Sequence, residues 1–189
     1  MCGSALLPTA VGTFRAFAIK DAQNAEHLIL IRGDVRGRSG VLTRVHSECL
    51  TGDVLGSLKC DCGPQLRLAI RRIAKARAGI LFYLRQEGRG IGLVHKIRAY
   101  RLQEIGFDTV QANVALGLPI DAREYRLVAR VLRGLRVRSI RLLTNSPDKV
   151  RKLRRSGVRI AARVPLRTRA TPQNIHYLRT KREVLGHDI

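Results

Sequence analysis

The sequence of 189 residues has no tryptophan and only four phenylalanines and four tyrosines. It is therefore poorly supplied with the base-stacking platforms of single-strand nucleic-acid-binding proteins. Long apolar runs are also missing: the longest, Val114 to Ile120, contains a glycine and a proline and falls far short of the ~20 residues of a membrane span. No basic residue precedes Arg15, so no secretory signal is indicated. We therefore expect a soluble, cytoplasmic protein with no membrane association.

Acidic residues are scarce, since 14 Asp and Glu stand against 36 Lys and Arg and leave a net charge of +22. Hydrophobic residues still make up 45% of the chain, so the charge does not indicate disorder. Such a balance favours anionic partners such as nucleic acids or polyphosphates, although dispersed charges are also typical of solvated faces in an Arg-rich chain. The length and the lack of any linker predict a single domain over residues 1–189.

Hydrophobic periodicity predicts an α/β fold in which helices layer a mixed β-sheet. The first third of the chain is hairpin-like, and further on short apolar runs alternate with amphipathic helices. The predicted strands cover residues 13–19, 27–32, 41–45, 80–84, 139–143 and 158–164. The predicted helices cover residues 64–78, the stretch from the glycine-rich segment 86–92 to about 105, and residues 123–135, 146–156 and 171–185.

Cysteines are few, yet three of the four fall within fourteen residues, at Cys49, Cys60 and Cys62. In a cytoplasmic chain this pattern indicates metal binding more than disulfides, and thiolates are soft ligands that suit zinc. Three protein ligands leave the fourth tetrahedral position open, as in catalytic zinc sites, where the pKa of a bound water falls to about 7. A closed structural site would need a fourth ligand, which Cys2 or His46 could supply.

A glycine-rich segment, RQEGRGIG at residues 85–92, follows a predicted strand and opens a predicted helix. Glycines let the backbone approach a ligand closely, and a helix N-terminus offers free N–H groups to an anion. Glu87 and Arg89 favour a polyanion site here, although a plain strand–loop–helix turn has the same pattern.

Two further predicted helix starts carry candidate polar groups. Asp121 with Arg123 precedes one helix, and Thr144 with Lys149 spans the start of another, for which Ser146 is the predicted N-cap. Both pairs suit phosphate binding at a helix N-terminus, and capping of the helix is the simpler alternative for each. Tyr100 lies on the helix after the glycine-rich segment, where it either packs in the core or points its hydroxyl into a site.

Taken together and in this order, these motifs closely resemble GTP cyclohydrolase II, which opens riboflavin biosynthesis. The resemblance runs from about Leu7 to the end of the chain. It implies a zinc enzyme that hydrolyses GTP, releases formate and pyrophosphate, and leaves a diaminopyrimidinone ribosyl phosphate. The motifs that carry it are RVHSECLTGD at 44–53, CDCG at 60–63, RQEGRGIGL at 85–93, DAREY at 121–125 and RLLTN at 141–145.

The resemblance also implies roles for single residues. Asp121 takes the family's proton-acceptor position, Arg123 that of its proposed nucleophile and Tyr100 that of its catalytic tyrosine. A guanidinium stays protonated below pH ~12, so a phosphate clamp is the alternative for Arg123. Zinc would be held by Cys49, Cys60 and Cys62, and Mg²⁺ would accompany the triphosphate of GTP. Nucleotide contacts would fall on Arg44, Val45, His46, Ser47, Glu48, Gln65, Glu87, Gly88, Arg89, Thr109, Thr144 and Lys149.

A homodimer is a further implication of the resemblance. The sequence departs from the family pattern at His95, Ser146 and Thr171, which leaves open a paralogue of secondary metabolism that stops at the formylated intermediate. A zinc-stabilised nucleic-acid-binding module is the alternative from another class, and it would bind nucleic acid in a salt-dependent way without turning over GTP. For the enzyme itself, nucleic-acid contacts through the basic surface would be non-specific.

Overall fold

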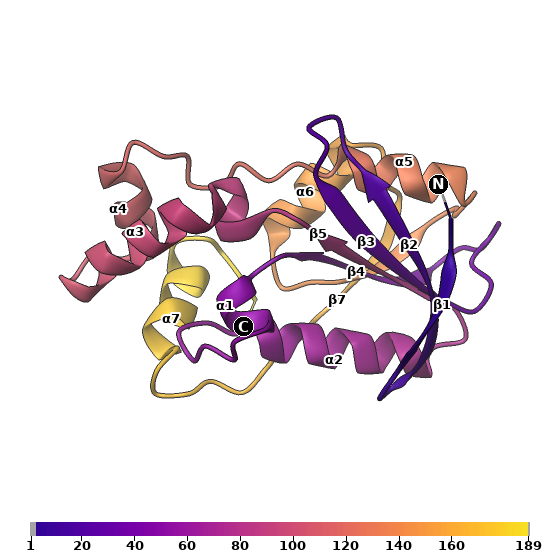
Figure 1. Cartoon of the computed structure of the whole chain (residues 1–189), viewed down its shortest axis with the longest axis horizontal. Helices are drawn as coiled ribbons and strands as arrows, with labels where there is room; N and C mark the ends of the chain where they lie inside the picture. The colour runs from indigo at the N-terminus through magenta and orange to yellow at the C-terminus, as the bar shows by residue number, and fades with distance from the viewer. Residues whose placement is uncertain (1–2, 189) are drawn as a thin grey trace.

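The computed structural model describes residues 3–188, in which seven strands form one mixed β-sheet with helices on both faces (Figure 1). The predicted α/β class is confirmed. The strands are β1 (Ala5–Thr9), β2 (Gly12–Lys20), β3 (Glu26–Arg32), β4 (Val41–Ser47), β5 (Gly79–Leu84), β6 (Ile140–Leu143) and β7 (Ile160–Val164). The helices are α1 (Leu50–Asp53), α2 (Cys62–Lys75), α3 (Gly92–Glu104), α4 (Thr109–Ala115), α5 (Arg126–Gly134), α6 (Pro147–Arg155) and α7 (Ile175–Glu183), with a 3-10 turn at Glu87–Gly90.

The sheet is antiparallel in one half and parallel in the other. Its strand order is β1-β2-β3-β5-β4-β6-β7, and β5, β4, β6 and β7 run parallel to one another. In the register of the central pair, Ser47 lies opposite Leu84. The carboxyl ends of β4, β5 and β6 therefore meet at one edge of the sheet, which is where open α/β sheets bind their ligands.

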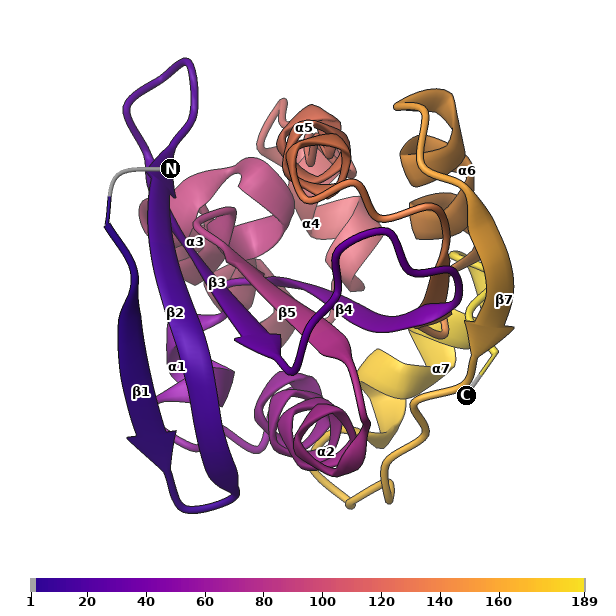
Figure 2. The same ribbon diagram turned by 90° about the vertical axis from the view of Figure 1, so that its right-hand side faces the viewer.

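Helices cover the two faces of the sheet unequally: α2 lies on one face, and α5 and α6 lie on the other (Figure 2). Successive side chains of a strand point to opposite faces, so each layer receives alternate residues of β5. Leu81 packs in the cluster that contains Ile73 of α2, and Phe82 packs in the cluster that contains Val128 of α5. Because both faces are covered, β5 is a nearly continuous apolar run, as buried parallel strands usually are.

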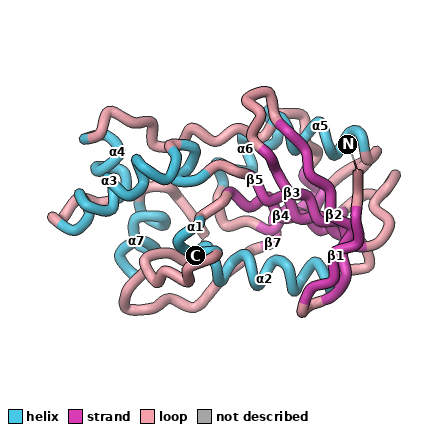
Figure 3. Tube along the Cα trace, viewed as in Figure 1, coloured by secondary structure: helices cyan, strands magenta, loops and turns pink. Residues whose placement is uncertain are grey.

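Three helices lie beyond the sheet rather than against it. Helices α3, α4 and α7 gather past the carboxyl ends of the central strands (Figures 1 and 3). No helix of residues 3–188 has both the length and the apolar character needed to cross a membrane. The arrangement leaves the residues between the strand ends and these outer helices as the natural place for a site.

Most predicted elements are present with shifted ends, and the cap of α6 is confirmed: the Ser146 hydroxyl accepts a hydrogen bond from the backbone N–H of Lys149. The predicted helix 123–135 begins instead at Arg126. Asp121 does not cap it, because its carboxylate binds the backbone and side chain of Arg123. The last helix is also shorter than predicted, since residues 171–174 form a turn before Ile175.

Three elements were not predicted. Strand β1 is mostly exposed and contains a proline, so it carries little alternation. Helix α1 has only four residues, too few for a periodic pattern. Helix α4 does carry a signal, a capping box in which Asp108 accepts from the backbone of Gln111 while the Gln111 side chain accepts from the backbone of Asp108.

Candidate active site

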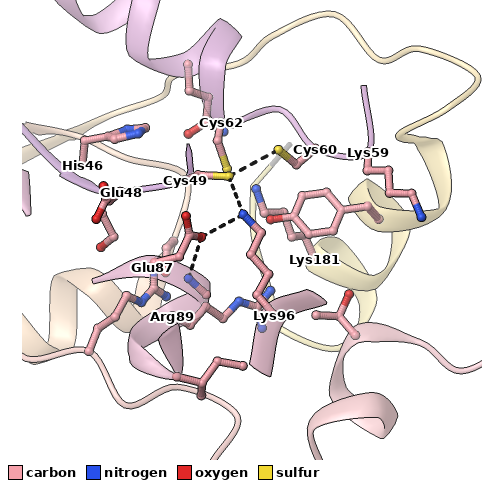
Figure 4. A pocket seen from close by; sticks show the side chains of 18 of the residues that line it. His46, Glu48, Cys49, Lys59, Cys60, Cys62, Glu87, Arg89, Lys96 and Lys181 are labelled. Atoms are coloured by element: carbon pink, nitrogen blue, oxygen red, sulfur yellow. Dashed lines mark hydrogen bonds and ion pairs between the residues drawn. The ribbon is translucent and has the colours of Figure 1, made fainter. Parts of the chain in front are cut away.

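Three thiols meet where α1 faces the first turn of α2. The Sγ atoms of Cys49, Cys60 and Cys62 all lie within 4.8 Å of one another, and the distance from Cys49 to Cys60 is 3.7 Å (Figure 4). A tetrahedral zinc with Zn–S bonds of ~2.3 Å holds its sulfurs roughly 3.8 Å apart. The cluster can therefore hold a metal ion, and its soft donors and spacing suit zinc.

Two glycines make room for the thiols. A Cβ on Gly52 would lie 2.7 Å from Sγ of Cys60 and 3.2 Å from Sγ of Cys49. A Cβ on Gly63 would lie 2.1 Å from the carbonyl oxygen of Gly52, so α1 and α2 touch through backbone at this point. The close approach brings Cys49 to the two cysteines that precede and open α2, and it forms a cradle for an ion.

Cys49 is the thiol of the cluster whose pKa is lowered. Hydrogen bonds from the thiols of Cys60 and Cys62 hold the pKa of Cys49 well below its usual range, and the charge of Lys96 acts in the same direction. The same contact with Cys49, together with burial, raises the pKa of Cys60 to about 11. A neighbouring cation that favours thiolate also favours metal binding, because only the deprotonated sulfur is a ligand.

That cation is a buried lysine on α3. Nζ of Lys96 lies 3.2 Å from Sγ of Cys49, 2.8 Å from Oε1 of Glu87 and 2.9 Å from Oγ1 of Thr51 (Figure 4). One turn later on the helix, the hydroxyl of Tyr100 lies 3.5 Å from Oγ1 of Thr51. No role is predicted for Lys96 from the sequence, although its spacing from Tyr100 places both residues on one helix face.

The structure does not use His46 as a fourth ligand. Nε2 of His46 lies 2.9 Å from Oδ2 of Asp53, and the ring stacks on Tyr83 with centroids 5.5 Å apart. Within residues 3–188 the three cysteines are the one group of His, Cys, Asp or Glu placed to hold an ion. Cys2, the other predicted alternative, lies outside the described residues. A tetrahedral ion on these three thiolates has one position left for a water or a substrate.

The glycine-rich segment next to the cluster has a constrained backbone. Gly88, Arg89 and Gly90 all have positive φ, at 60°, 62° and 92°, which is uncommon for a residue such as Arg89. Its conformation is held by a hydrogen bond of 3.0 Å from the N–H of Ala122 to the carbonyl of Arg89. The Arg89 side chain lines the cavity beside the thiols. This contact also joins the segment to the stretch that carries Asp121 and Arg123.

Asp121 and Arg123 form a two-point ion pair. Nε of Arg123 donates to Oδ1 of Asp121 at 2.9 Å, and Nη2 donates to Oδ2. Burial alone would raise the pKa of Asp121, but Arg123 and then Lys152 hold it well below its usual range. Arg123 lines the cavity, whereas Asp121 lies behind it. The carboxylate is thus placed to orient the guanidinium.

Two more cations are fixed by carbonyl groups at the strand ends. Nζ of Lys149 donates to the carbonyl of Val45 at 2.7 Å, and Nη1 of Arg44 donates to the carbonyl of Leu143 at 2.9 Å. Burial, followed by the charge of Arg44, lowers the pKa of Lys149 well below its ordinary value. An anionic ligand beside Lys149 would reverse that shift, so the site is poised to receive negative charge.

One cavity unites nearly all of the predicted site residues, and its lining carries seven Lys and Arg against two Glu, which suits an anionic ligand. Two of the predicted site residues do not line the cavity. One is Asp121, and the other is Val45, whose side chain packs in the core. The predicted residues that line the cavity are Arg44, His46, Ser47, Glu48, Cys49, Cys60, Cys62, Gln65, Glu87, Gly88, Arg89, Tyr100, Thr109, Arg123, Thr144 and Lys149. Polar lining residues without a predicted binding role are Lys59, Lys96, Gln103, Asn113, Asn145, Ser146, Tyr177, Lys181 and His187.

The fold and the cavity define an α/β protein with a thiol metal site at the carboxyl ends of its parallel strands. The model of the GTP cyclohydrolase II family matches residues 2–165, and the chain belongs to this family. It is 51% identical over 184 residues to GTP cyclohydrolase-2 from Neisseria gonorrhoeae, which covers 97% of this chain and 93% of that protein.

A second relative is longer than this chain. Riboflavin biosynthesis protein RibBA from Salinispora arenicola is 53% identical over 189 residues, which are 99% of this chain and 45% of that protein. The chain therefore spans about half the length of RibBA. The solved structure of RibBX, a two domain 3,4-dihydroxy-2-butanone 4-phosphate synthase from A. baumannii, matches with a TM-score of 0.43 and 20% identity over 88% of this chain and 39% of that one. A likeness at that level supports no inference.

Replacement of Gly52 by Ala should disrupt the thiol cradle, because the added methyl group would lie 2.7 Å from Sγ of Cys60. We expect metal affinity to fall by at least about tenfold, equivalent to ~1.4 kcal/mol, as measured by competition with a chelator. Gly134→Ala is the matched control, since a Cβ there meets nothing within 4 Å. Equal affinity in the two variants would show that Gly52 does not shape the site.

Proposed function

We propose that this protein is a zinc-dependent GTP cyclohydrolase II, which hydrolyses GTP to a diaminopyrimidinone ribosyl phosphate with release of formate and pyrophosphate, the first step of riboflavin biosynthesis. The observation that carries the proposal is the thiol cluster, which opens into a cavity lined by seven cations. Membership of the family and 51% identity over nearly the full length of GTP cyclohydrolase-2 support the same activity. A cytoplasmic location and a homodimer are parts of the same proposal.

Cys49, Cys60 and Cys62 would hold the zinc ion. When bound there, zinc supplies a Lewis acid that lowers the pKa of a water in its open position to about 7. Lys96 would compensate the charge of the Cys49 thiolate, because its Nζ lies 3.2 Å from Sγ of Cys49. Mg²⁺ would arrive with the triphosphate, because this ion is usually bound by phosphates and waters rather than by a protein cage.

The guanine base would lie at the thiol end of the cavity. The ring carbon that leaves as formate must reach the cluster, and the nearest polar groups there are Lys96 and the hydroxyl of Tyr100, both tied to Thr51. Tyr100 would donate a proton or a hydrogen bond to the opening ring. The triphosphate would then extend to Arg123, where positive charge meets the departing pyrophosphate.

Arg123 acts in this proposal as a phosphate clamp rather than as a nucleophile. Burial alone would lower the pKa of Arg123, but the hydrogen bonds that it donates to Asp121 raise it above the usual arginine value. A guanidinium that keeps its proton has no free electron pair with which to attack phosphorus. Asp121, with both oxygens engaged by Arg123, orients the clamp.

The direct test is incubation with GTP, Zn²⁺ and Mg²⁺, followed by separate assays of formate and pyrophosphate. Release of both products is the expected result. Pyrophosphate without formate would identify a variant reaction that stops at the formylated intermediate. Neither product from protein shown to contain zinc would overturn the proposed activity.

Cys60→Ser should separate the two halves of the reaction. Loss of one thiolate weakens the metal site, so we expect formate release to be abolished while pyrophosphate release persists at a reduced rate, because Arg123 and Lys149 are unchanged. Zinc content is measured on the same sample. Formate release at the wild-type rate would remove the metal from the ring-opening step.

Arg123→Lys keeps the charge but loses the two-point pair with Asp121. If Arg123 is a phosphate clamp, this variant should release pyrophosphate at a rate within about a hundredfold of wild type, since a flexible ammonium still attracts phosphate. Its KM for GTP should rise. Arg123→Gln, which removes the charge, should be slower still. Complete loss of release in Arg123→Lys, with GTP still bound in a direct binding assay, would favour a nucleophilic guanidine.

A further inference from the structure

Helix α7 contacts the metal loop, the segment Cys60–Cys62, through a buried ion pair. Neither residue of this pair has a role in the proposed function. Nζ of Lys181 lies 2.5 Å from Oδ1 of Asp61, and the two residues are only 7% and 1% exposed. Asp61 stands between Cys60 and Cys62 in the chain. A cation from the C-terminal helix therefore holds the segment that presents two of the three thiols.

The second oxygen of Asp61 extends this contact through Gln65 to Arg44, which lines the cavity. Nε2 of Gln65 donates to Oδ2 of Asp61 at 2.6 Å, and Nη2 of Arg44 donates to Oε1 of Gln65 at 2.7 Å. Lys181, Asp61, Gln65 and Arg44 thus form a buried polar chain that connects α7, the metal loop, α2 and β4. All four members are buried, where an unpaired charge is costly and a satisfied network is rigid.

The residues after α7 fix that helix to the strand ends. The chain turns at Gly186, which has φ of 62°, and the N–H of His187 donates to the carbonyl of Lys181 at 2.9 Å. The N–H of Asp188 donates to the carbonyl of Asn145 at 3.0 Å. Lys181 and His187 both line the cavity, and Figure 4 shows Lys181 among the side chains around the thiols. All of these C-terminal residues lie beyond residues 2–165, which the family model matches.

We propose that Lys181 and Asp61 are a positioning pair through which α7 sets both the Cys60–Cys62 loop and the Arg44 guanidinium. Neither residue needs to touch the reacting atoms. Without Lys181, Asp61 is a buried carboxylate with no cation, so the loop that carries Cys60 and Cys62 must shift or take up water. Metal retention and nucleotide binding therefore both depend on the C-terminal helix. The nucleotide part rests on the proposed function, whereas the metal part stands on the thiol cluster alone.

The test is a double-substitution cycle read out by metal release. Zinc-loaded Lys181→Met, Asp61→Asn and the double variant are mixed with an excess of a chromogenic chelator, and the release rate is followed. Changes in groups that hold a metal-ligand segment typically cost 10–100-fold in metal affinity, and we expect Lys181→Met to release zinc faster by roughly that factor. The double variant should release zinc no faster than Lys181→Met, because Asn leaves no charge to be stranded.

Three comparisons separate positioning from general loss of stability. Arg163→Gln breaks a half-exposed ion pair of 3.2 Å with Asp188 and should leave zinc release unchanged. Lys181→Arg should recover part of the slow release, since it restores a cation for Asp61. In steady-state assays with GTP, Lys181→Met should raise KM more than it lowers kcat, because Arg44 binds substrate and is reached through Gln65.

Each outcome decides the inference. Zinc release from Lys181→Met at the wild-type rate, or release that is additive in the double variant, would overturn the pairing. Should Lys181→Met fail to fold by circular dichroism, Asp61→Asn alone carries the test, because it is isosteric and keeps an oxygen for Gln65; unchanged release would then overturn the inference. Absence of GTP turnover in the wild type would refute only the proposed function, since the metal-release arms are independent of it.

Discussion

The parallel alignment of β4, β5 and β6 is the constraint on which the rest of the site depends. Ser47 lies opposite Leu84, so the segments that follow β4 and β5 leave the sheet side by side, and they carry the first thiol and the glycine-rich turn. Thr43 lies opposite Leu142, which brings the end of β6 to the same edge. A shift of one residue would turn Arg44 to the other face of the sheet and separate it from Gln65 on α2.

The cavity assembles many cations, and five of the seven have a fixed partner. Lys96 is bound by Glu87, Lys181 by Asp61 and Arg123 by Asp121. Lys149 and Arg44 instead use backbone carbonyls at the strand ends. Partnered side chains lose less freedom when a ligand arrives, and charges held in place before the reaction stabilise developing negative charge at little reorganisation cost. The same pairing explains how so basic a chain can place positive groups in its interior.

Sequence patterns predicted those parts of the molecule that depend on neighbours close in the chain. The apolar run of β5, the Ser146 cap and the spacing of the cysteines belong to this class. Long-range contacts were not accessible in this way. Lys96 and Lys181 reach partners that lie 47 and 120 residues away in the chain, and each looks like an ordinary helix lysine in the sequence.

The same distinction explains the elements that were wrong or overlooked. Asp121 has the local signature of a cap, but its carboxylate binds Arg123 and α5 begins only at Arg126. Helix α1 touches α2 through two glycines, a long-range contact that periodicity cannot reveal. Arg89 illustrates a further consequence. A left-handed conformation costs a non-glycine residue about 1–2 kcal/mol, and the chain carries arginine there between two glycines. The molecule thus spends folding free energy at a single backbone position that keeps a guanidinium in the lining of its cavity.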